Sequence, residues 1–216
     1  MSMLKEDDKK AVKEFFKELV NPVKLVMFTQ ESECEYCSHT RELVEDVAAL
    51  SDKIELEVHD FLKDKAKAEE YGIDKVPAVV LVGERDYGIR FYGIPAGYEF
   101  TTLIEDIVDV SKRDHGLGPE IVEQLSTIDR PVKMQVMVTP NCPHCTRAVR
   151  TAHRFAMASE HITGEMVETS EFPQLAVKYR VSGVPDTIVN ENHRLLGGQP
   201  VGEFLRVVKE AAAAFH

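Results

Sequence analysis

The sequence predicts an α/β protein built from two copies of one layered domain, each with a mixed central sheet, flanking helices and an extra helix at its start. Three observations support this fold class. The chain has 216 residues, more than one small core needs. One sequence pattern recurs after 108 positions. Within each copy, short apolar strands alternate with amphipathic helices. With 44% hydrophobic residues, each copy can bury a core of its own.

The repeat is visible in residues that carry local chemistry. Two Cys-x-x-Cys motifs and two Val-Pro pairs stand in the same register in the two halves of the chain. The residues that match 108 positions apart are Cys34 and Cys142, Cys37 and Cys145, Tyr71 and Tyr179, and Pro77 and Pro185. We therefore expect domains at 1–115 and 116–216. The segment His115 to Pro119 joins them, because its glycines are flexible and its proline suits a helix start.

In the first copy, apolar residues at helical spacing from Val12 to Val20 predict a helix that ends before Asn21. Ile54, Leu56 and Val58 alternate with charged residues, which is typical of a strand with one wetter face. The expected later elements are strand 23–29, a helix opened by the first cysteine pair and reaching Leu50, strand 54–58, helix 63–70, strands 78–82 and 89–92 around a turn at 83–88, and a helix around 103–108.

The second copy predicts the same order of elements. The expected ranges are helix 119–128, strand 132–139, helix 143–158, strand 163–169, helix 172–179, strands 187–190 and 193–196, and helix 202–214. No low-complexity segment interrupts either copy.

Charge and hydropathy exclude several classes of protein. Lys and Arg number 26 against 37 Asp and Glu, a net charge of −11, which disfavours binding to nucleic acids and anionic membranes. No stretch approaches the roughly 18–20 apolar residues of a membrane span. Residues 1–10 alternate between acidic and basic, unlike a signal peptide. The sequence thus predicts a soluble, cytoplasmic protein.

All four cysteines lie in the two Cys-x-x-Cys motifs. A secreted scaffold held by disulfides is usually shorter and richer in cysteine, so these pairs indicate redox chemistry or metal binding. One shared zinc is disfavoured, because 104 residues separate Cys37 from Cys142, against about 12–20 in zinc modules. Inert structural disulfides are also disfavoured, because so small a loop constrains the unfolded chain little.

A Cys-x-x-Cys pair at a strand-to-helix turn is suited to thiol–disulfide exchange. Residues three apart share one side of a helix, so their sulfurs can meet in a bond of about 2 Å. The positive end of a helix stabilises a thiolate at the first position. We therefore predict that Cys34 and Cys142 are the nucleophiles, and that Cys37 and Cys145 are the resolving thiols.

At this point the motifs carry a family resemblance. Cys-x-x-Cys after an apolar strand, with Val-Pro 40 residues beyond the second cysteine, resembles the thioredoxin fold. The order Cys-Glu-Tyr-Cys and then Cys-Pro-His-Cys is similar to the two-domain protein disulfide oxidoreductases, also called glutaredoxin-like proteins, of thermophilic archaea and bacteria. The resemblance implies two tandem thioredoxin-like folds. It also implies cis Val76-Pro77 and Val184-Pro185 bonds beside the two sites, where the backbone before each proline binds a substrate strand.

The sequence departs from thioredoxin at several positions. It has no tryptophan, and Glu33 and Asn141 precede the first cysteines where an aromatic residue is usual. Phe28 and Val136 stand where a buried acid is expected on the preceding strand, so proton transfer to the resolving thiol needs another route, such as water. The sequence has no evident cluster of basic residues that could bind the carboxylates of glutathione, so glutathione binding is not expected.

The two sites are expected to differ. A carboxylate at Glu35 opposes thiolate formation at the first site, whereas a protonated His144 favours it at the second. Pro143 stiffens the first helical turn without loss of a hydrogen bond, and Tyr36 is expected at the rim of the first site. The second site is therefore predicted to have the more acidic nucleophile and the more oxidising disulfide.

These features predict an enzyme that reduces, forms or isomerises disulfides in protein substrates through mixed disulfides. It needs no bound cofactor beyond its own redox-active disulfides, and no metal. The resemblance implies electrons from an NADPH-dependent flavoprotein of the thioredoxin reductase kind, in the cytoplasm of a thermophile. Two alternatives stay open. One is an electron carrier to a peroxiredoxin, resembling the tandem N-terminal domains of the alkyl hydroperoxide reductase flavoprotein; the other is a non-catalytic module that binds metal or acts as a chaperone.

Overall fold

The computed structural model describes residues 3–214, so the expected domain ranges extend beyond the described residues by two positions at each end. We call 3–115 the first half and 116–214 the second half. The elements are α1 (Glu6–Phe16), β1 (Val23–Thr29), α2 (Cys37–Ala48), β2 (Ile54–Asp60), α3 (Lys65–Glu70), β3 (Ala78–Val82), β4 (Asp86–Tyr92) and α4 (Tyr98–Lys112), followed by α5 (Pro119–Leu125), β5 (Val132–Val138), α6 (Cys145–Ala158), β6 (Ile162–Glu168), α7 (Pro173–Lys178), β7 (Asp186–Val189), β8 (His193–Leu196) and α8 (Val201–Ala213).

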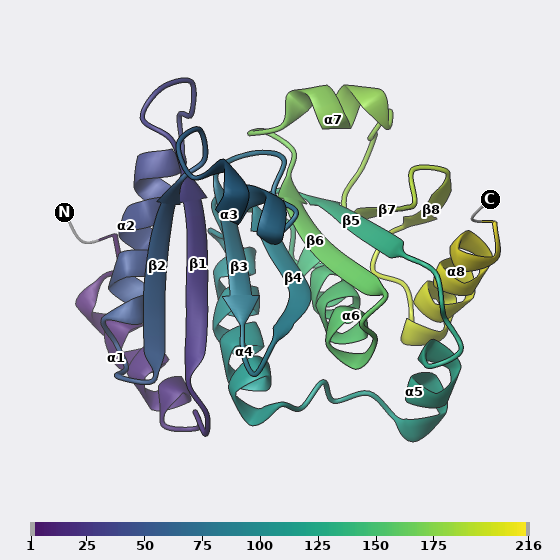
Figure 1. The fold of residues 1–216 in the computed structure, drawn as a ribbon, viewed down its shortest axis with the longest axis horizontal. Coiled ribbons are helices and arrows are strands. Elements are labelled where there is room, and N and C mark those ends of the chain that lie inside the picture. Colours follow the sequence, from purple (N-terminus) through teal and green to yellow (C-terminus); the bar gives the residue numbers. More distant parts are fainter. Residues whose placement is uncertain (1–2, 215–216) are drawn as a thin grey trace.

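The two halves share one continuous sheet rather than forming two separate ones. Its eight strands lie in the order β2-β1-β3-β4-β6-β5-β7-β8 (Figure 1). The halves join where β4 pairs in parallel with β6, from Ile89 opposite Gly164 to Tyr92 opposite Val167. Each half has the predicted mixture of parallel and antiparallel pairs. The predicted fold class is confirmed, and the fused sheet is an addition to it.

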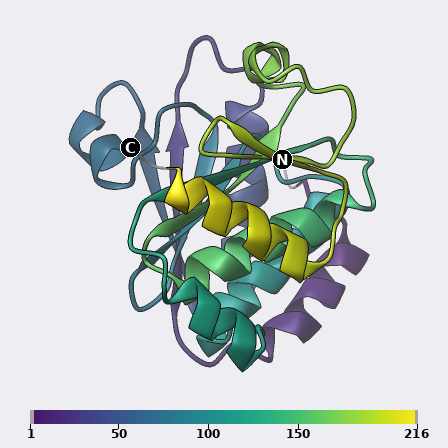
Figure 2. The ribbon, with the colours of Figure 1, turned by 90° about the vertical axis from the view of Figure 1, so that its right-hand side faces the viewer.

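Helices cover both faces of this sheet. Alternate residues of β1 point to opposite faces, so Leu25 and Met27 join one apolar cluster while Val26 and Phe28 join the other. The larger cluster packs α1, α2, α4, α5, α6 and α8 against the sheet, and the smaller one packs α3 and α7. Figure 2 shows α1 in purple and α3 in blue on opposite sides of the strands.

Several element ends differ from the prediction. Helix α1 ends at Phe16, so the expected continuation to Val20 is wrong; Leu19 is buried from a turn, and Val20 is 61% exposed. Helix α2 begins at Cys37, the second cysteine of its pair, rather than at the first, and α6 begins at Cys145 rather than at residue 143. Strand β4 begins at Asp86, which shortens the expected turn. Apolar spacing alone continues through such ends, because burial by tertiary packing also occurs outside helices.

Helices α4 and α6 hold the halves together through a buried ionic cluster. The Arg150 guanidinium of α6 contacts carboxylates of α4 at Glu105 (3.1 Å), Asp106 (2.5 Å) and Asp109 (2.9 Å). His153, fully buried, lies with Nδ1 2.6 Å from Asp106 and Nε2 3.3 Å from the Arg90 carbonyl. His153 is therefore a buried histidine with a partner at each ring nitrogen.

Among residues 3–214, none of the helices combines the length and apolar character that crossing a bilayer requires.

Candidate functional site

The two cysteine motifs lie at one edge of the sheet. Strands β1, β2, β4, β6 and β5 all run in the same direction, so their carboxyl ends meet there. The loop after β1 carries Cys34, and the loop after β5 carries Cys142. We call Cys34–Cys37 with loop 30–36 the first site, and Cys142–Cys145 with loop 139–144 the second site.

Both pairs form disulfides. The Cα–Cα distances are 5.5 Å for Cys34–Cys37 and 5.4 Å for Cys142–Cys145. In each pair the first cysteine is the more accessible: Cys34 is partly exposed and Cys37 is 2% exposed, while Cys142 is 8% and Cys145 0% exposed. An incoming thiol or disulfide therefore reaches the first sulfur more easily.

Each disulfide sits at the start of a helix, as predicted, but the first cysteine precedes the helix. Tyr36 and His144 are the N-cap residues, and neither makes a side-chain capping bond within the described residues. The first turns of both helices contain no acidic residue. A helix start with neither a side-chain cap nor an acidic residue suits a thiolate at the first cysteine.

The two Val-Pro bonds are cis, as the resemblance implied. Because Phe28 pairs with Ala78, Pro77 lies level with Thr29, where the first-site loop leaves β1. By the same argument, Pro185 lies level with Val138 at the second site. Within the described chain, neither Val76 nor Val184 makes a backbone–backbone hydrogen bond. Their main-chain groups can pair with an extended substrate.

The residues between the cysteines face solvent, but the two loops differ in charge. Glu35 and Tyr36 are exposed at the first site, and Pro143 and His144 at the second. The first-site loop adds exposed carboxylates at Glu31 and Glu33, whereas residues 139–144 contain none. The first site is therefore the more acidic surface.

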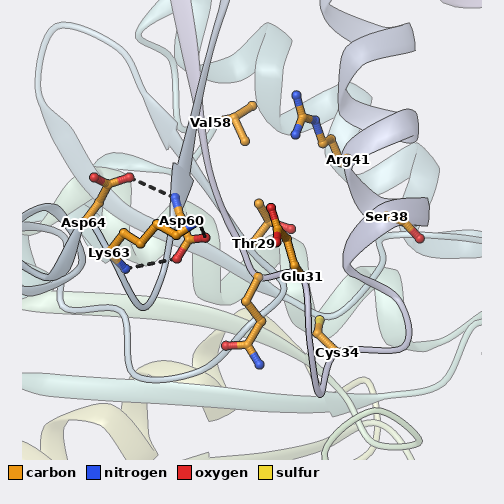
Figure 3. Close-up of a pocket in the computed structure, with 10 residues that line it drawn as sticks. Thr29, Glu31, Cys34, Ser38, Arg41, Val58, Asp60, Lys63 and Asp64 are labelled. Atoms are coloured by element: carbon orange, nitrogen blue, oxygen red, sulfur yellow. Dashed lines mark hydrogen bonds and ion pairs between the residues drawn. The ribbon is translucent and has the colours of Figure 1, made fainter.

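A cavity of about 520 Å³ opens beside Cys34 (Figure 3). Cys34 and Ser38 line one side of it, and the segment that follows β2 lines the other. On that far side, the backbone N–H of Asp60 donates to Asp64 at 2.9 Å, and Lys63 pairs with Asp60 at 3.3 Å. The cavity can accommodate polar substrate residues next to a substrate disulfide that reacts with Cys34.

Glu99 is a functional candidate that the sequence analysis missed. It lies in the first turn of α4, is 1% exposed, and has no hydrogen-bond partner for either carboxylate oxygen among the described residues. Burial raises the pKa of Glu99 to about 7. The nearby Thr102 hydroxyl lowers this pKa, although it does not form a hydrogen bond with the carboxylate, and the charge of Asp106 raises it further. The carboxyl can therefore exchange a proton near neutrality.

Helix packing places Glu99 beside the second site. Helices α4 and α6 both start at the cysteine edge and run in parallel, with Asp106 level with Arg150 and His153. Seven residues, or two turns, back along each helix, Glu99 is level with the start of α6 at Cys145. The adjacent Tyr98 N–H also donates to the Pro140 carbonyl in the second-site loop at 3.1 Å.

Glu171, after β6, is a corresponding carboxyl on the side of the first site. Its Oε1 accepts a hydrogen bond from the Ile94 N–H at 2.7 Å, and its buried Oε2 has no partner within residues 3–214. Burial raises the pKa of Glu171 to about 7, opposed by the Ile94 N–H and increased by the charges of Glu168 and Glu35. The Gly93 N–H, next to Ile94, donates to the Pro77 carbonyl at 2.9 Å, which places this carboxyl on the side of the first site.

Both carboxyls come from the half opposite to the nearby cysteines. Phe28 and Val136, the positions where an acid was sought, are fully buried apolar residues. A polar stripe of Glu99, Thr102 and Asp106 at helical spacing was the available signal in the sequence. A zinc shared by all four cysteines does not fit, because β3, β4 and β6 lie between the two pairs.

Comparison with known proteins supports the fold and the paired sites. A family model described as a thioredoxin domain matches residues 23–105 and 132–209. The crystal structure of a protein disulfide oxidoreductase from Aeropyrum pernix is 32% identical, covers 99% of this chain and 95% of that chain, and superposes with a TM-score of 0.92. The N-terminal NTD_N/C domain of alkyl hydroperoxide reductase AhpF from Enterococcus faecalis is 26% identical, covers 95% of this chain and 99% of that one, with a TM-score of 0.88.

Curated relatives are longer proteins. The alkyl hydroperoxide reductase AhpF of Pseudomonas aeruginosa is 24% identical over 215 residues, which cover 98% of this chain and 38% of that protein. NADH dehydrogenase of Bacillus subtilis is 27% identical over 150 residues, covering 68% of this chain and 27% of that protein. The chain thus spans less than two fifths of either relative.

Proposed function

Because this chain belongs to the thioredoxin-domain family, with two such domains in tandem and a disulfide at each helix start, we propose that it is a protein disulfide oxidoreductase that exchanges disulfides and dithiols with protein substrates. The observation that carries this proposal is an arrangement that occurs at both sites. The first cysteine is more accessible than the second, and the valine before the cis-proline makes no backbone–backbone hydrogen bond within the described residues.

The reductive reaction proceeds through a mixed disulfide. The thiolate of Cys34 or Cys142 attacks one sulfur of a substrate disulfide, and the other substrate sulfur leaves as a thiolate and takes a proton. The Cys37 or Cys145 thiolate then attacks the first cysteine, which releases the second substrate thiol and forms the enzyme disulfide. Run backwards, these steps oxidise a substrate dithiol. Reduction of one substrate disulfide, followed by oxidation that joins a different pair of substrate cysteines, isomerises the substrate.

Positions near the sulfurs orient the substrate. The main chains of Val76 and Val184 bind an extended substrate segment, with Pro77 and Pro185 fixing the course of the chain beside them. Tyr36 contributes an apolar rim to the first site, where its side chain is 38% exposed. Pro143 restricts the turn that carries Cys142. These contacts bring the substrate sulfur into line with the first cysteine.

Glu99 supplies the proton-transfer group that the β5 strand lacks. A carboxyl with a pKa near 7, level with the start of α6, can accept the proton of the Cys145 thiol as it attacks the mixed disulfide. The proton returns when the disulfide is reduced again. This route needs no acid on β5.

The second site is the more oxidising of the two in this proposal. His144 beside Cys142 favours the thiolate and so stabilises the reduced state, whereas Glu35 opposes it at Cys34. Alkylation against pH, with the resolving cysteine replaced, is expected to give Cys142 the lower pKa, and Glu35→Gln is expected to lower the pKa of Cys34. A lower pKa for Cys34 in the unmodified loop would reverse the ranking.

Electrons for reduction come from an NADPH-dependent flavoprotein of the thioredoxin reductase kind, and the protein works in the cytoplasm of a thermophile, where intracellular disulfides are common.

The alkyl hydroperoxide reductase relatives favour a second candidate function, in which the chain passes electrons to a peroxiredoxin. Turnover with a peroxiredoxin, without turnover of insulin, would select this second function.

Insulin reduction tests the main proposal. With dithiothreitol as electron source, the wild-type chain is expected to accelerate precipitation of the insulin B chain, and each variant with serines at one site is expected to retain part of the rate. The variant with Cys34→Ser, Cys37→Ser, Cys142→Ser and Cys145→Ser is expected to fall to the uncatalysed rate, with unchanged circular dichroism. A quadruple variant as active as wild type would leave only non-catalytic functions.

A further inference from the structure

The topology sets a distance between the two strands that lead into the disulfides. Going from β1 to β5 along the sheet crosses β3, β4 and β6, which makes four interstrand steps. At about 4.8 Å a step, the ends of the two strands are roughly 19 Å apart. Two cysteines can form a disulfide only when their Cα atoms are within about 7 Å. The disulfides therefore lie well beyond the range of direct exchange.

The contacts between the halves oppose any movement that would close this distance. The β4–β6 ladder and the Arg150 cluster join the halves within the sheet and behind it. At the cysteine edge itself, Glu171 of the second half accepts from Ile94 of the first, and the Pro140 carbonyl accepts from Tyr98. Because the intervening strands belong to the same sheet, the sites cannot meet unless that sheet is broken.

We propose that electrons do not pass between the two disulfides within one molecule, and that they pass from the first site of one copy to the second site of another copy. This inference rests on the proposed function. Cys34 is partly exposed and Cys142 is accessible only at a small fraction of its surface. Both nevertheless lie at the cysteine edge of the sheet, and the residues between each pair of cysteines are exposed, so a second molecule can reach either disulfide.

The exchange between copies balances as follows. The Cys34 thiolate of a reduced first site attacks Cys142 of an oxidised second site, and the Cys142–Cys145 bond breaks as Cys145 leaves and takes a proton. Cys37 then loses its proton and attacks Cys34, which forms the Cys34–Cys37 disulfide and releases Cys142. With the first cysteine counted as a thiolate at each site, two electrons and one proton, which Cys37 loses and Cys145 gains, move from one site to the other. No further oxidant or reductant is required.

The test compares wild type with a mixture of single-site variants. The reduced variant with Cys142→Ser and Cys145→Ser is mixed with the oxidised variant with Cys34→Ser and Cys37→Ser, and acid quenching, alkylation and mass spectrometry give the second-order rate constant. Wild type is then half reduced by tris(carboxyethyl)phosphine, or half oxidised by diamide from the reduced state. Both reagents are expected to react first at the more exposed first site. The phosphine therefore leaves the first site reduced and the second oxidised, whereas diamide leaves the first site oxidised and the second reduced. At least one of these two states lies away from equilibrium and must relax.

We expect the relaxation rate of wild type to rise tenfold when its concentration rises tenfold, to match the constant from the mixture, and to extrapolate to zero at zero concentration. A concentration-independent rate would overturn the inference, as would a mixture that does not exchange. Insulin reduction by each single-site variant reports on the proposed function separately, because it needs no exchange between the sites.

Discussion

At the scale of the residue, Glu99 couples the stability of the fold to pH. Its pKa is about 7 in the folded chain against an ordinary value of 4.5, so the folded state binds more protons between these limits. Stability therefore falls as pH rises from about 4.5 to about 7, because the unfolded chain releases this proton more easily. The full cost above pH 7 is about 3 kcal/mol.

Glu99→Gln is expected to remove this loss. At pH 8 the variant gains up to about 3 kcal/mol in the free energy of unfolding, and near pH 4.5 the gain disappears. Urea unfolding followed by circular dichroism across pH 4.5–8 measures it. The same variant is expected to resolve mixed disulfides at the second site more slowly at neutral pH.

Glu120→Gln is the matched control. Glu120 also stands in the first turn of a helix, α5, but it is exposed. Its replacement is expected to leave the pH profile of stability unchanged. Parallel profiles for wild type and Glu99→Gln would contradict the assignment of the raised pKa.

The sequence predicted the four cysteines, and the family resemblance implied the two cis-prolines, but neither indicated Glu99 or Glu171. Cysteine spacing is a local property, so it can be recognised in the sequence without knowledge of packing. A carboxyl supplied by the opposite half depends on how the halves pack, and an internal repeat contains no information about that arrangement.

At the scale of the element, the start of α4 is fitted closely to the second-site loop. Gly97 has a φ of 61°, and a Cβ there would lie 2.2 Å from the Pro140 carbonyl oxygen. Gly97→Ala is expected to destabilise the fold by about 2 to 4 kcal/mol and to slow exchange at the second site on the order of 10- to 100-fold, because the loop must shift. Insulin reduction in a Cys34→Ser, Cys37→Ser background measures the effect.

Gly202 gives the control, because it lies in the first turn of α8 and a Cβ there would meet nothing within 4 Å. Gly202→Ala is expected to preserve activity and to gain up to about 1 kcal/mol of stability. Equal losses in both variants would show that the contact with Pro140 has no special role.

The Arg150 cluster is expected to contribute strongly to the joint between α4 and α6. Arg150→Met leaves the 2% exposed side chain of Asp106 without its guanidinium partner, at a cost of about 3 to 5 kcal/mol. Arg206→Met, which removes ion pairs with Glu203 and Glu210 on the surface of α8, is expected to cost less than about 1 kcal/mol. Urea midpoints that shift equally would refute the distinction.

The order of elements followed from apolar periodicity, whereas their ends did not. The extra residues predicted for the first helix come from Leu19, which continues the helical spacing but is buried from a turn. The first cysteine pair was expected to open its helix and the second helix to start at residue 143, but each helix begins only at the second cysteine of its pair. Such ends depend on caps and tertiary contacts that spacing does not encode.

At the scale of the whole molecule, the fused sheet is expected to make the chain unfold as one unit. The β4–β6 ladder and the α4–α6 ion pairs cross the joint, so loss of one half exposes apolar surface of the other. Urea unfolding followed by circular dichroism and by tyrosine fluorescence should give coincident curves. Two resolved transitions would mean that the halves are independent.

The sequence predicted two copies of the fold but not their fusion. Strands β4 and β6 are buried along most of their length, as central strands are. Their Arg90 and Glu165 side chains are buried too, and charged residues of this kind hide the signal of a central strand in the sequence.

The β4–β6 contact is of the head-to-tail kind, in which the last strand of one copy meets an early strand of the next. Repeated between molecules, this contact would join β8 to β2 and grow an open-ended filament. The terminal strands are poor templates for such growth: β8 has four residues where β4 has seven, and β2 presents Glu55 and Glu57 along the other end of the sheet. The short outer strand β8 and the charged side chains of the outer strand β2 therefore disfavour further strand pairing beyond the two copies within one chain.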